Sequence, residues 1–195
     1  MPEVVDHDES WPVVRSVDLH RDDWVVALRE DHLQRPGHPE DEPFTRLVLE
    51  HPGAVVILAV DEQERVLCLW QYRHPAERTF VELPAGLLDV AGEDPLEAAR
   101  RELVEEAGLG AAEWTPIGST YSSPGISSER HHYFLARGLA EQDRGDFVAH
   151  HEEAEMQTGW VPARELHAAV VDGRVGDGHT VIAVLMAQAQ GLLEV

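Results

Sequence analysis

The segment from residue 94 to 109, DPLEAARRELVEEAGL, constrains the fold of this chain more than any other. Asp94 is a residue type that caps helix N-termini, and Pro95 suits the first helical position. Gly108 is the usual residue type just beyond a helix end. This order of residues predicts a helix over the segment.

Three carboxylates share one face of this predicted helix. Each helical residue turns about 100°, which places Glu102, Glu105 and Glu106 side by side. Like charges at these separations destabilise a helix by about 0.2–0.5 kcal/mol per pair, and hard divalent cations offset that repulsion. Taken alone, the three residues fit a solvated face better than a metal site, so the surrounding sequence decides.

The residues around these glutamates follow a fixed pattern. It runs from Gly86 through Glu93 to RELVEEAGL at 101–109, and it resembles the Nudix box, G-x5-E-x7-R-E-U-x-E-E-x-G-U, where U is a bulky aliphatic residue. Six residues rather than five separate Gly86 from Glu93, while the spacing from Glu93 to Arg101 is kept. On this pattern the chain resembles the Nudix hydrolase family.

The resemblance implies a metal site. Glu102 and Glu106 would be direct ligands, Glu105 a ligand that acts directly or through water, and the carbonyl of Ala85 a ligand from the preceding loop. The implied cofactor is Mg²⁺ or Mn²⁺, with more than one ion per site. Such ions neutralise a diphosphate and generate hydroxide from bound water near neutral pH.

Further catalytic residues follow from the same resemblance. Arg101 and Glu93 would brace the site, because an Arg beside ligating carboxylates orients them and keeps them ionised. A Glu on a later loop activates water or completes the metal site in this family. Here the loop offers Glu153 as first choice and Glu152 as second, with Glu155 close by. The alternative for these glutamates is an idle, solvated loop.

The substrate class is suggested by residues outside the box. Pro124 lies sixteen residues after Gly108, where the Nudix sub-group that cleaves ADP-ribose often carries a Pro, although Pro124-Gly125 also fits a plain tight turn. Bacterial ADP-ribose pyrophosphatases also resemble this chain at YRH (72–74), ELPAGLLDVAGE (82–93), SPG (123–125) and HHEEAEMQTGW (150–160). The expected reaction converts ADP-ribose and water to AMP and ribose 5-phosphate.

Three more residues are expected to contact substrate. Arg73 follows an apolar strand and resembles the phosphate-contacting Arg of the family, and Glu129 lies just after the SPG segment. Trp24 offers an aromatic face for adenine, with core packing as the alternative explanation.

The remaining sequence predicts an α/β Nudix sandwich, with a mixed sheet between helices and a small antiparallel sheet before it. Residues 1–10 form an acidic tail, 11–50 the small N-terminal sheet and 51–195 the hydrolase domain. In similar enzymes the N-terminal sheet exchanges between subunits, so the resemblance implies a homodimer through that sheet and a nucleoside pocket beside it.

Individual elements are predicted from periodicity and turn residues. AVVILAV (54–60) and RVLCLWQYR (65–73) flank the polar turn DEQE and fit a hairpin of buried strands. The other predicted strands lie near 24–30, 44–50, 114–121, 131–139 and 156–162, and further helices lie near 163–171 and 179–192.

Charge and cysteine content limit the partners. A net charge of −22 argues against nucleic acid and anionic membrane as partners, because phosphate surfaces attract Lys and Arg clusters. The single Cys68 cannot form an intrachain disulfide and no leader pattern opens the chain, so a cytoplasmic protein is expected.

Three rival functions remain beside ADP-ribose hydrolysis. The first is hydrolysis of another nucleoside diphosphate derivative, such as GDP-mannose or NADH, because the box recognises the diphosphate and not its substituent. The second is a sensor that binds ADP-ribose without cleaving it, although such regulators usually carry a DNA-binding segment and a degraded box. The third is a buffer of divalent cations on acidic loops, which the ordered helix caps and box spacing oppose.

Overall fold

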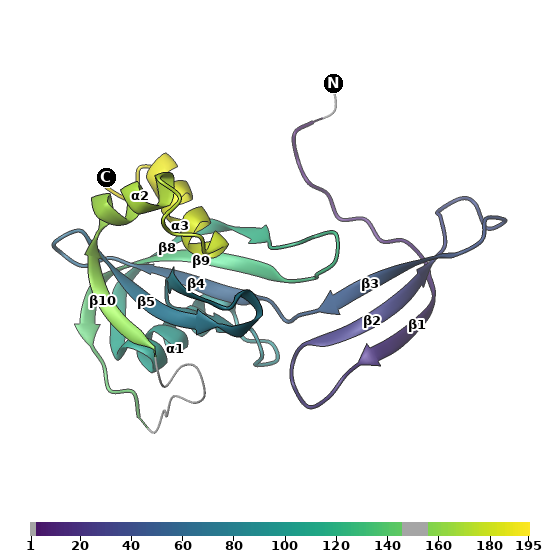
Figure 1. Cartoon of the computed structure of the whole chain (residues 1–195), viewed down its shortest axis with the longest axis horizontal. Coiled ribbons are helices and arrows are strands. Elements are labelled where there is room, and N and C mark those ends of the chain that lie inside the picture. Colours follow the sequence, from purple (N-terminus) through teal and green to yellow (C-terminus); the bar gives the residue numbers. More distant parts are fainter. Residues whose placement is uncertain (1–2, 146–155) are drawn as a thin grey trace. The chain divides into compact units, whose positions relative to one another are not determined.

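The computed structural model describes residues 3–145 and 156–195, which fall into two compact units (Figure 1). The N-terminal unit comprises Met1–Pro52 and Tyr121–Glu129. The main unit comprises Gly53–Thr120 and Arg130–Val195. Each unit has its own sheets, so each is described by itself.

The N-terminal unit contains a three-stranded antiparallel sheet in the order β1-β2-β3. Its strands are β1 (Val13–His20), β2 (Ala27–Leu33) and β3 (Phe44–Glu50). The segment Tyr121–Glu129 joins this unit through Leu49, whose N–H donates to Ile126 and whose carbonyl accepts from Ser128. The small antiparallel sheet expected from the sequence is therefore present, with β1 as a strand that the sequence analysis did not specify.

The main unit is a mixed α/β sandwich, as predicted. Its strands form sheets in the orders β10-β5-β6 and β7-β4-β9-β8, and β4 and β9 run parallel. The strands are β4 (Ala54–Ala59), β5 (Arg65–Arg73), β6 (Arg78–Glu82), β7 (Ala85–Leu87), β8 (Leu109–Tyr121), β9 (Arg130–Glu141) and β10 (Gln157–Pro162). The helices are α1 (Pro95–Ala107), α2 (Ala163–Val171), α3 (Gly178–Ala189) and a 3-10 turn, His74–Ala76.

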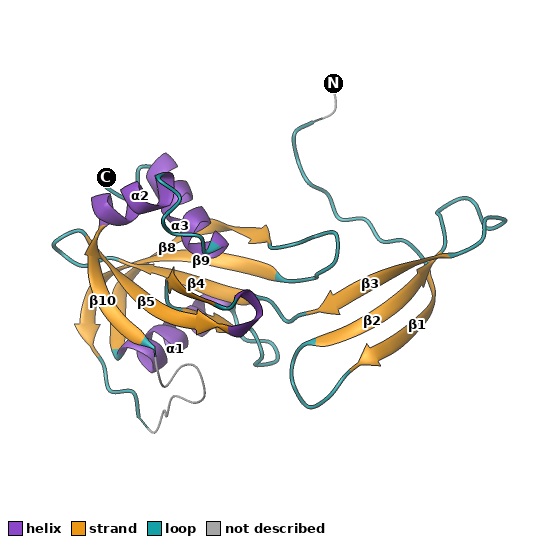
Figure 2. Cartoon of the chain, viewed as in Figure 1, coloured by secondary structure: helices purple, strands orange, loops and turns teal. Residues whose placement is uncertain are grey.

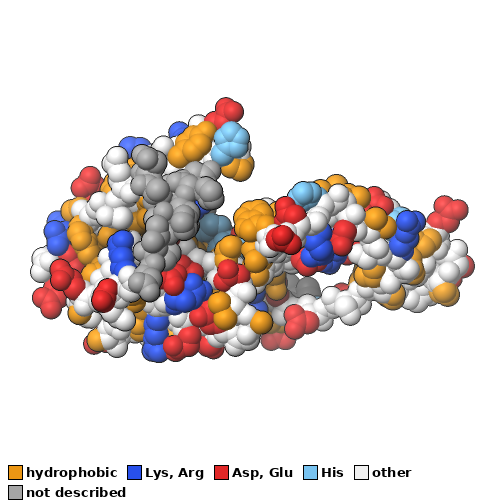
Figure 3. Space-filling view, turned by 90° about the horizontal axis from the view of Figure 1, so that it is seen from below, with side chains coloured by type: hydrophobic (Ala, Val, Ile, Leu, Met, Phe, Trp, Pro, Cys, Tyr) orange, Lys and Arg blue, Asp and Glu red, His pale blue; other side chains and the backbone are white. Residues whose placement is uncertain are grey.

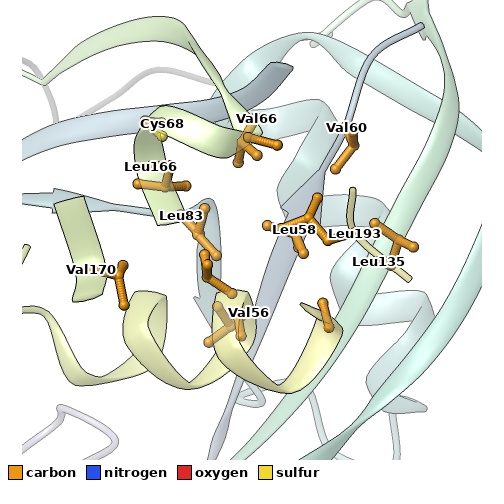
Figure 4. Packing of buried hydrophobic residues seen from close by; sticks show 14 of the residues in the cluster. Val56, Leu58, Val60, Val66, Cys68, Leu83, Leu135, Leu166, Val170 and Leu193 are labelled. Atoms are coloured by element: carbon orange, nitrogen blue, oxygen red, sulfur yellow. The ribbon is translucent and has the colours of Figure 1, made fainter. Parts of the chain in front are cut away.

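Helices cover both sides of the strands in this unit (Figure 2). On one side, Val56 and Leu58 of β4 pack with residues of α2 and α3 in the cluster drawn in Figure 4. On the other side, Val55 and Ile57 pack against Leu103 and other residues of α1. Because successive strand residues point to opposite faces, the unbroken apolar run of β4 supplies both cores.

The helix predictions are confirmed closely. In α1 the Asp94 carboxylate accepts from the N–H of Leu96 at 2.9 Å, and Gly108 ends the helix with a φ of 66°. The second helix coincides with the predicted 163–171, and the third begins one residue before His179. Side-chain caps at Asp94 and Asp177 start α1 and α3, and Gly108 ends α1, whereas α2 has neither a side-chain cap nor a glycine at its C-cap.

The predicted hairpin of residues 54–60 and 65–73 is wrong beyond its turn. Asp61 N donates to the Arg65 carbonyl and Val60 bridges Val66, but β4 and β5 then enter different sheets. Each strand has two other neighbours: β9 and β7 for β4, and β10 and β6 for β5. Both strands are apolar enough to lie in the middle of a sheet. Each is therefore paired on both edges with other strands, and the two do not pair with each other along their length.

Acidic side chains are spread over the face drawn in Figure 3, and several lie beside Arg side chains. This mixture agrees with the ion pairs found in both units, such as Arg21 with Glu50 and Arg137 with Glu64. Among the described residues, no helix has the length and apolar character needed to cross a membrane.

Candidate active site

Strand β7 is tied to the acidic face of α1. The backbone N–H of Ala85 donates to Glu106 Oε2 at 3.0 Å. The same strand and the residue before it are anchored to β4, because Ile57 N donates to the Pro84 carbonyl at 2.8 Å and Val56 pairs with Ala85. The Nudix-box helix and the strand β7 thus form one rigid corner.

Gly86 allows the carboxylate of Glu102 to approach the backbone of β7. A Cβ atom at position 86 would lie 1.9 Å from Glu102 Cδ and 2.1 Å from its Oε1. No side chain fits in that space. The first glycine of the box is therefore required by the close packing of a glutamate against a strand, and its φ is not in the left-handed region.

Arg101 connects three glutamates of the box, Glu93, Glu102 and Glu105, in one hydrogen-bond network. Its Nε and Nη2 donate to the two carboxylate oxygens of Glu93 at 3.3 and 3.1 Å. Its Nη1 donates to Glu102 at 2.6 Å and to Glu105 at 3.1 Å. The guanidinium charge lies between three carboxylates, which reduces the repulsion expected on this helix face.

Burial raises the pKa of the Glu102 carboxyl to about 7, against the opposing attraction of Arg101. The negative charges of Glu105 and Asp89 raise that pKa further. The side chain is only 13% exposed, so its charged form lacks water. A cation beside it would stabilise the ionised form.

The donor set fits a hard divalent cation. The carboxylates of Glu102, Glu105 and Glu106 and the carbonyl of Ala85 are oxygen donors that belong to one corner of the fold, as Mg²⁺ and Mn²⁺ prefer. Gly86 leaves room for the Glu102 carboxylate. Because this carboxylate is buried, its negative charge favours a nearby cation. In the structure as it stands, Arg101 supplies that positive charge.

A different group brings ligand atoms closer together. Among the described residues, only His38, Glu40 and Asp41 place three such side chains with ligand atoms within 4.8 Å of one another. Arg35 already contacts His38 and Asp41 in this loop. A fixed positive charge at that position disfavours a cation.

Arg73 is held at the end of β5 by Glu82. Two hydrogen bonds of 2.9 and 2.6 Å join its guanidinium to the Glu82 carboxylate. Its pKa is raised first by this pairing, and also by the charges of Asp177 and Glu106. Arg73 is therefore electrostatically coupled to a box glutamate.

The other predicted substrate residues belong to the N-terminal unit. Trp24 is 67% exposed, which excludes core packing as its role in this unit. Pro124 lies in an exposed turn closed by bonds from Ile126 and Ser127 to the Ser123 carbonyl. Glu129 pairs with His51 at 3.4 Å, and burial lowers the pKa of that imidazole.

The predicted catalytic loop falls on residues that the structure does not describe. Glu152, Glu153 and Glu155 lie outside the described residues. Their roles therefore stay as predicted from the sequence.

Two carboxylates of this corner were not found by sequence reasoning. Glu82 is a buried carboxylate in the otherwise apolar stretch FVELPAGL, and Asp89 acts on Glu102 from the loop. A charged residue within an apolar stretch is the signal that could have identified Glu82, because a buried carboxylate requires a partner.

The main unit is thus a mixed α/β sandwich with a carboxylate-lined corner between β7 and α1. A family model described as "NUDIX domain" matches residues 50–182, and the chain therefore belongs to the Nudix family. Members of this family typically depend on divalent metal ions.

Relatives with known names support this assignment. The chain is 43% identical over 165 residues to an ADP-ribose pyrophosphatase of Mycobacterium tuberculosis, covering 85% of this chain and 77% of the relative. It is 32% identical to a methanol dehydrogenase activator of Bacillus methanolicus, covering 87% and 89%. A GDP-mannose pyrophosphatase of Yersinia enterocolitica is 33% identical, covering 73% and 76%.

A solved structure described as an ADP compounds hydrolase has the same fold. The TM-score is 0.74, and the match covers 97% of this chain and 100% of that one. The sequences are 18% identical, so the likeness concerns the fold alone.

Proposed function

We propose that this chain hydrolyses the diphosphate of ADP-ribose to give AMP and ribose 5-phosphate. The observation that carries the proposal is the 43% identity to an ADP-ribose pyrophosphatase over 85% of the chain. The Arg101 network and the Ala85–Glu106 bond supply the ordered carboxylates that such a reaction needs. In the reaction, a water oxygen forms a bond to one phosphorus while that phosphorus loses its bridging oxygen.

The proposed cofactor is Mg²⁺ or Mn²⁺, with more than one ion per site. Glu102, Glu105, Glu106 and the Ala85 carbonyl would hold these ions, which when bound neutralise the diphosphate and lower the pKa of water. Arg101 and Glu93 orient the ligating carboxylates through the bonds described above.

Other residues act on substrate and water in this proposal. Arg73 donates to a phosphate oxygen through its guanidinium. Glu153, with Glu152 as the alternative, accepts the proton of the attacking water. Both roles rest on the family resemblance, together with the coupling of Arg73 to Glu106.

The N-terminal unit would provide the nucleoside site and a homodimer interface. Exposed Trp24 suits stacking with adenine, and Pro124 and Glu129 lie in the segment that belongs to the same unit. Exposed apolar side chains on its strands, such as Val13, Leu19 and Leu47, suit contact with a second copy. Light scattering that gives a monomer mass would contradict the dimer.

GDP-mannose and NADH are the substrates to compare with ADP-ribose. The Yersinia relative makes GDP-mannose a specific candidate. Product formation with Mg²⁺ or Mn²⁺ should be fastest, at limiting substrate, with ADP-ribose. A higher kcat/KM with GDP-mannose or NADH would overturn the substrate assignment while leaving diphosphate hydrolysis intact.

The Glu106→Gln variant tests the site itself. Because Glu106 lies at the corner and accepts from Ala85, its neutral amide should reduce turnover by about a hundredfold or more while circular dichroism stays unchanged. Glu97→Gln on the same helix, with a side chain 58% exposed, is the matched control and should retain full turnover. Full activity of Glu106→Gln would exclude the proposed site.

A further inference from the structure

Glu82 binds Arg73 in a geometry that fixes the plane of the guanidinium. Arg73 Nε donates to Glu82 Oε1 at 2.9 Å and Nη2 donates to Oε2 at 2.6 Å. The Glu82 side chain is 9% exposed, whereas that of Arg73 is 49% exposed. A nearly buried carboxylate thus holds one edge of the guanidinium and leaves the side chain accessible to a ligand.

The chain segment after Glu82 connects this pair to the Nudix box. Only Leu83 and Pro84 separate Glu82 from Ala85, whose N–H donates to Glu106. Leu83 is buried and the Pro84 carbonyl accepts from Ile57, so the segment is anchored between its ends. Three extended residues span at most about 11 Å, which keeps the partner of Arg73 close to the metal-binding corner.

The electrostatics of Arg73 agree with this placement. Its pKa is raised by the hydrogen bonds to Glu82 and, against the effect of burial, by the negative charges of Glu82, Asp177 and Glu106. Arg73 therefore lies close enough to the box to interact electrostatically with Glu106. A diphosphate drawn to cations at this corner would bring its oxygens toward the same guanidinium.

We propose that Glu82 is a positioning residue, which holds the Arg73 guanidinium in the orientation that contacts a phosphate oxygen of the substrate. The inference rests on the proposed function and adds a residue that acts through Arg73. Fixing a long side chain before binding is worth about 0.5–1.5 kcal/mol, so loss of the restraint should weaken diphosphate binding by up to about tenfold.

The alternative is a purely structural ion pair between neighbouring strands, and the chain offers a matched control for it. Arg137 and Glu64 also share two hydrogen bonds, of 2.6 and 3.0 Å, in the same unit. The charges that raise the pKa of Arg137 come from Glu64, Glu194 and Glu113, none of which belongs to the box. Glu64→Gln therefore removes a comparable pair away from the site.

The test compares Glu82→Gln, Arg73→Lys and Glu64→Gln with the unaltered chain. Affinity for ADP with Mg²⁺ is measured by calorimetry, kcat and KM for ADP-ribose by product formation, and stability by thermal unfolding. Glu82→Gln should weaken ADP binding and raise KM by about two- to tenfold, with kcat within about threefold. Arg73→Lys should behave alike, because it keeps the charge but loses the planar fork. Glu64→Gln should match the unaltered chain in both constants.

The outcomes separate this inference from the proposed function. If the unaltered chain binds ADP but does not cleave ADP-ribose, the proposed function fails and the ADP affinities still decide the role of Glu82. Unchanged ADP affinity in Glu82→Gln would overturn the positioning role, as would an equal loss in Glu64→Gln. Should Glu82→Gln fail to fold, Arg73→Lys decides alone, and normal ADP affinity in that variant overturns the proposal. An unaltered chain that binds no ADP overturns the inference on Glu82, whereas the proposed function is then decided by cleavage of ADP-ribose alone.

Discussion

Gly86 matters because it has no side chain. The space that a Cβ atom would occupy is filled by the carboxyl group of Glu102. Any larger residue must displace either β7 or a proposed metal ligand, so a single methyl group at this position acts directly on the site.

We expect Gly86→Ala to lower kcat/KM for ADP-ribose by at least about tenfold. The added methyl group displaces the Glu102 carboxylate, which then no longer lies in position with the other proposed ligands. Steady-state kinetics would check this. Gly178→Ala is the control, since nothing lies within 4 Å of a Cβ built there and the residue opens α3. Equal activity of both variants would show that the close contact at Gly86 has no catalytic consequence.

Glu102 should destabilise the metal-free protein in a pH-dependent manner. Its carboxyl pKa is raised by burial from an ordinary value of 4.5 to about 7, so folding favours the protonated form. The cost is small below the unfolded pKa, grows as pH rises from there, and is complete above about pH 7. Charge at this position therefore opposes folding until a cation offsets it.

The Glu102→Gln variant measures that cost. With a chelator present, it should raise the unfolding temperature by about 2–6 °C at about pH 8, and by clearly less at about pH 5. Thermal unfolding followed by circular dichroism at both pH values is the measurement. The same gain at both would contradict the raised pKa.

Among the elements, α1 carries the proposed metal ligands, and its start is set by one cap. Asp94 accepts from the N–H of Leu96, and the helix then presents Ala98, Ala99 and Leu103 to the core. Glu102 follows Ala98 and Ala99 by one helical turn, so the glutamates begin directly beside this packed stripe. Weakening the cap therefore loosens the first turn before it affects the buried stripe.

Removing this cap should cost a modest amount of stability. Asp94→Ala is expected to lower the free energy of unfolding by about 1 kcal/mol, or about 2–4 °C in unfolding temperature. Asp94→Asn keeps a capping oxygen and should stay within about 1 °C of the unaltered chain. If the two variants lose stability equally, the charge of Asp94 and not its hydrogen bond stabilises α1.

The elements that could be predicted from sequence are those whose ends are determined locally. Asp94 and Gly108 mark α1 by their own chemistry, and the box spacing then gives the site glutamates. β7 could not be predicted, because three residues around Gly86 become a strand only through pairing with β4. The pairing of Glu82 with Arg73 could not be predicted either, because the β5–β6 register places Glu82 opposite Leu69 and Arg73 opposite Arg78, and only the folded side chains meet.

At the scale of the whole molecule, the two cores of the main unit are densely shielded. Cys68 lies in the cluster beneath α2, with no exposed surface, and burial raises the pKa of its thiol to about 12. The thiolate that reacts with disulfide reagents is therefore scarce and inaccessible in the folded chain.

Cys68 should report on opening of this core. In native buffer at about pH 8 we expect no reaction with a chromogenic disulfide reagent over minutes, and one equivalent per chain after addition of denaturant. A small free thiol in the same buffer is the control for the reagent. Rapid labelling of the native protein would show that the main unit opens far more easily than its packing indicates.

The parallel pairing of β4 with β9 has a consequence for biosynthesis. Ala54 pairs with His131, so the two strands are separated by 131 − 54 = 77 positions in the sequence. A ribosome adding about 5–20 residues per second needs roughly 4–15 s to make that stretch. During this interval the nascent β4 is a fully apolar strand without its neighbour β9. Ala85 and Glu106, which are hydrogen-bonded in the fold, are both synthesised before β9. The corner formed by β7 and α1 can thus be synthesised before the sheet that supports it is complete, and a translation stall before β9 leaves an aggregation-prone edge.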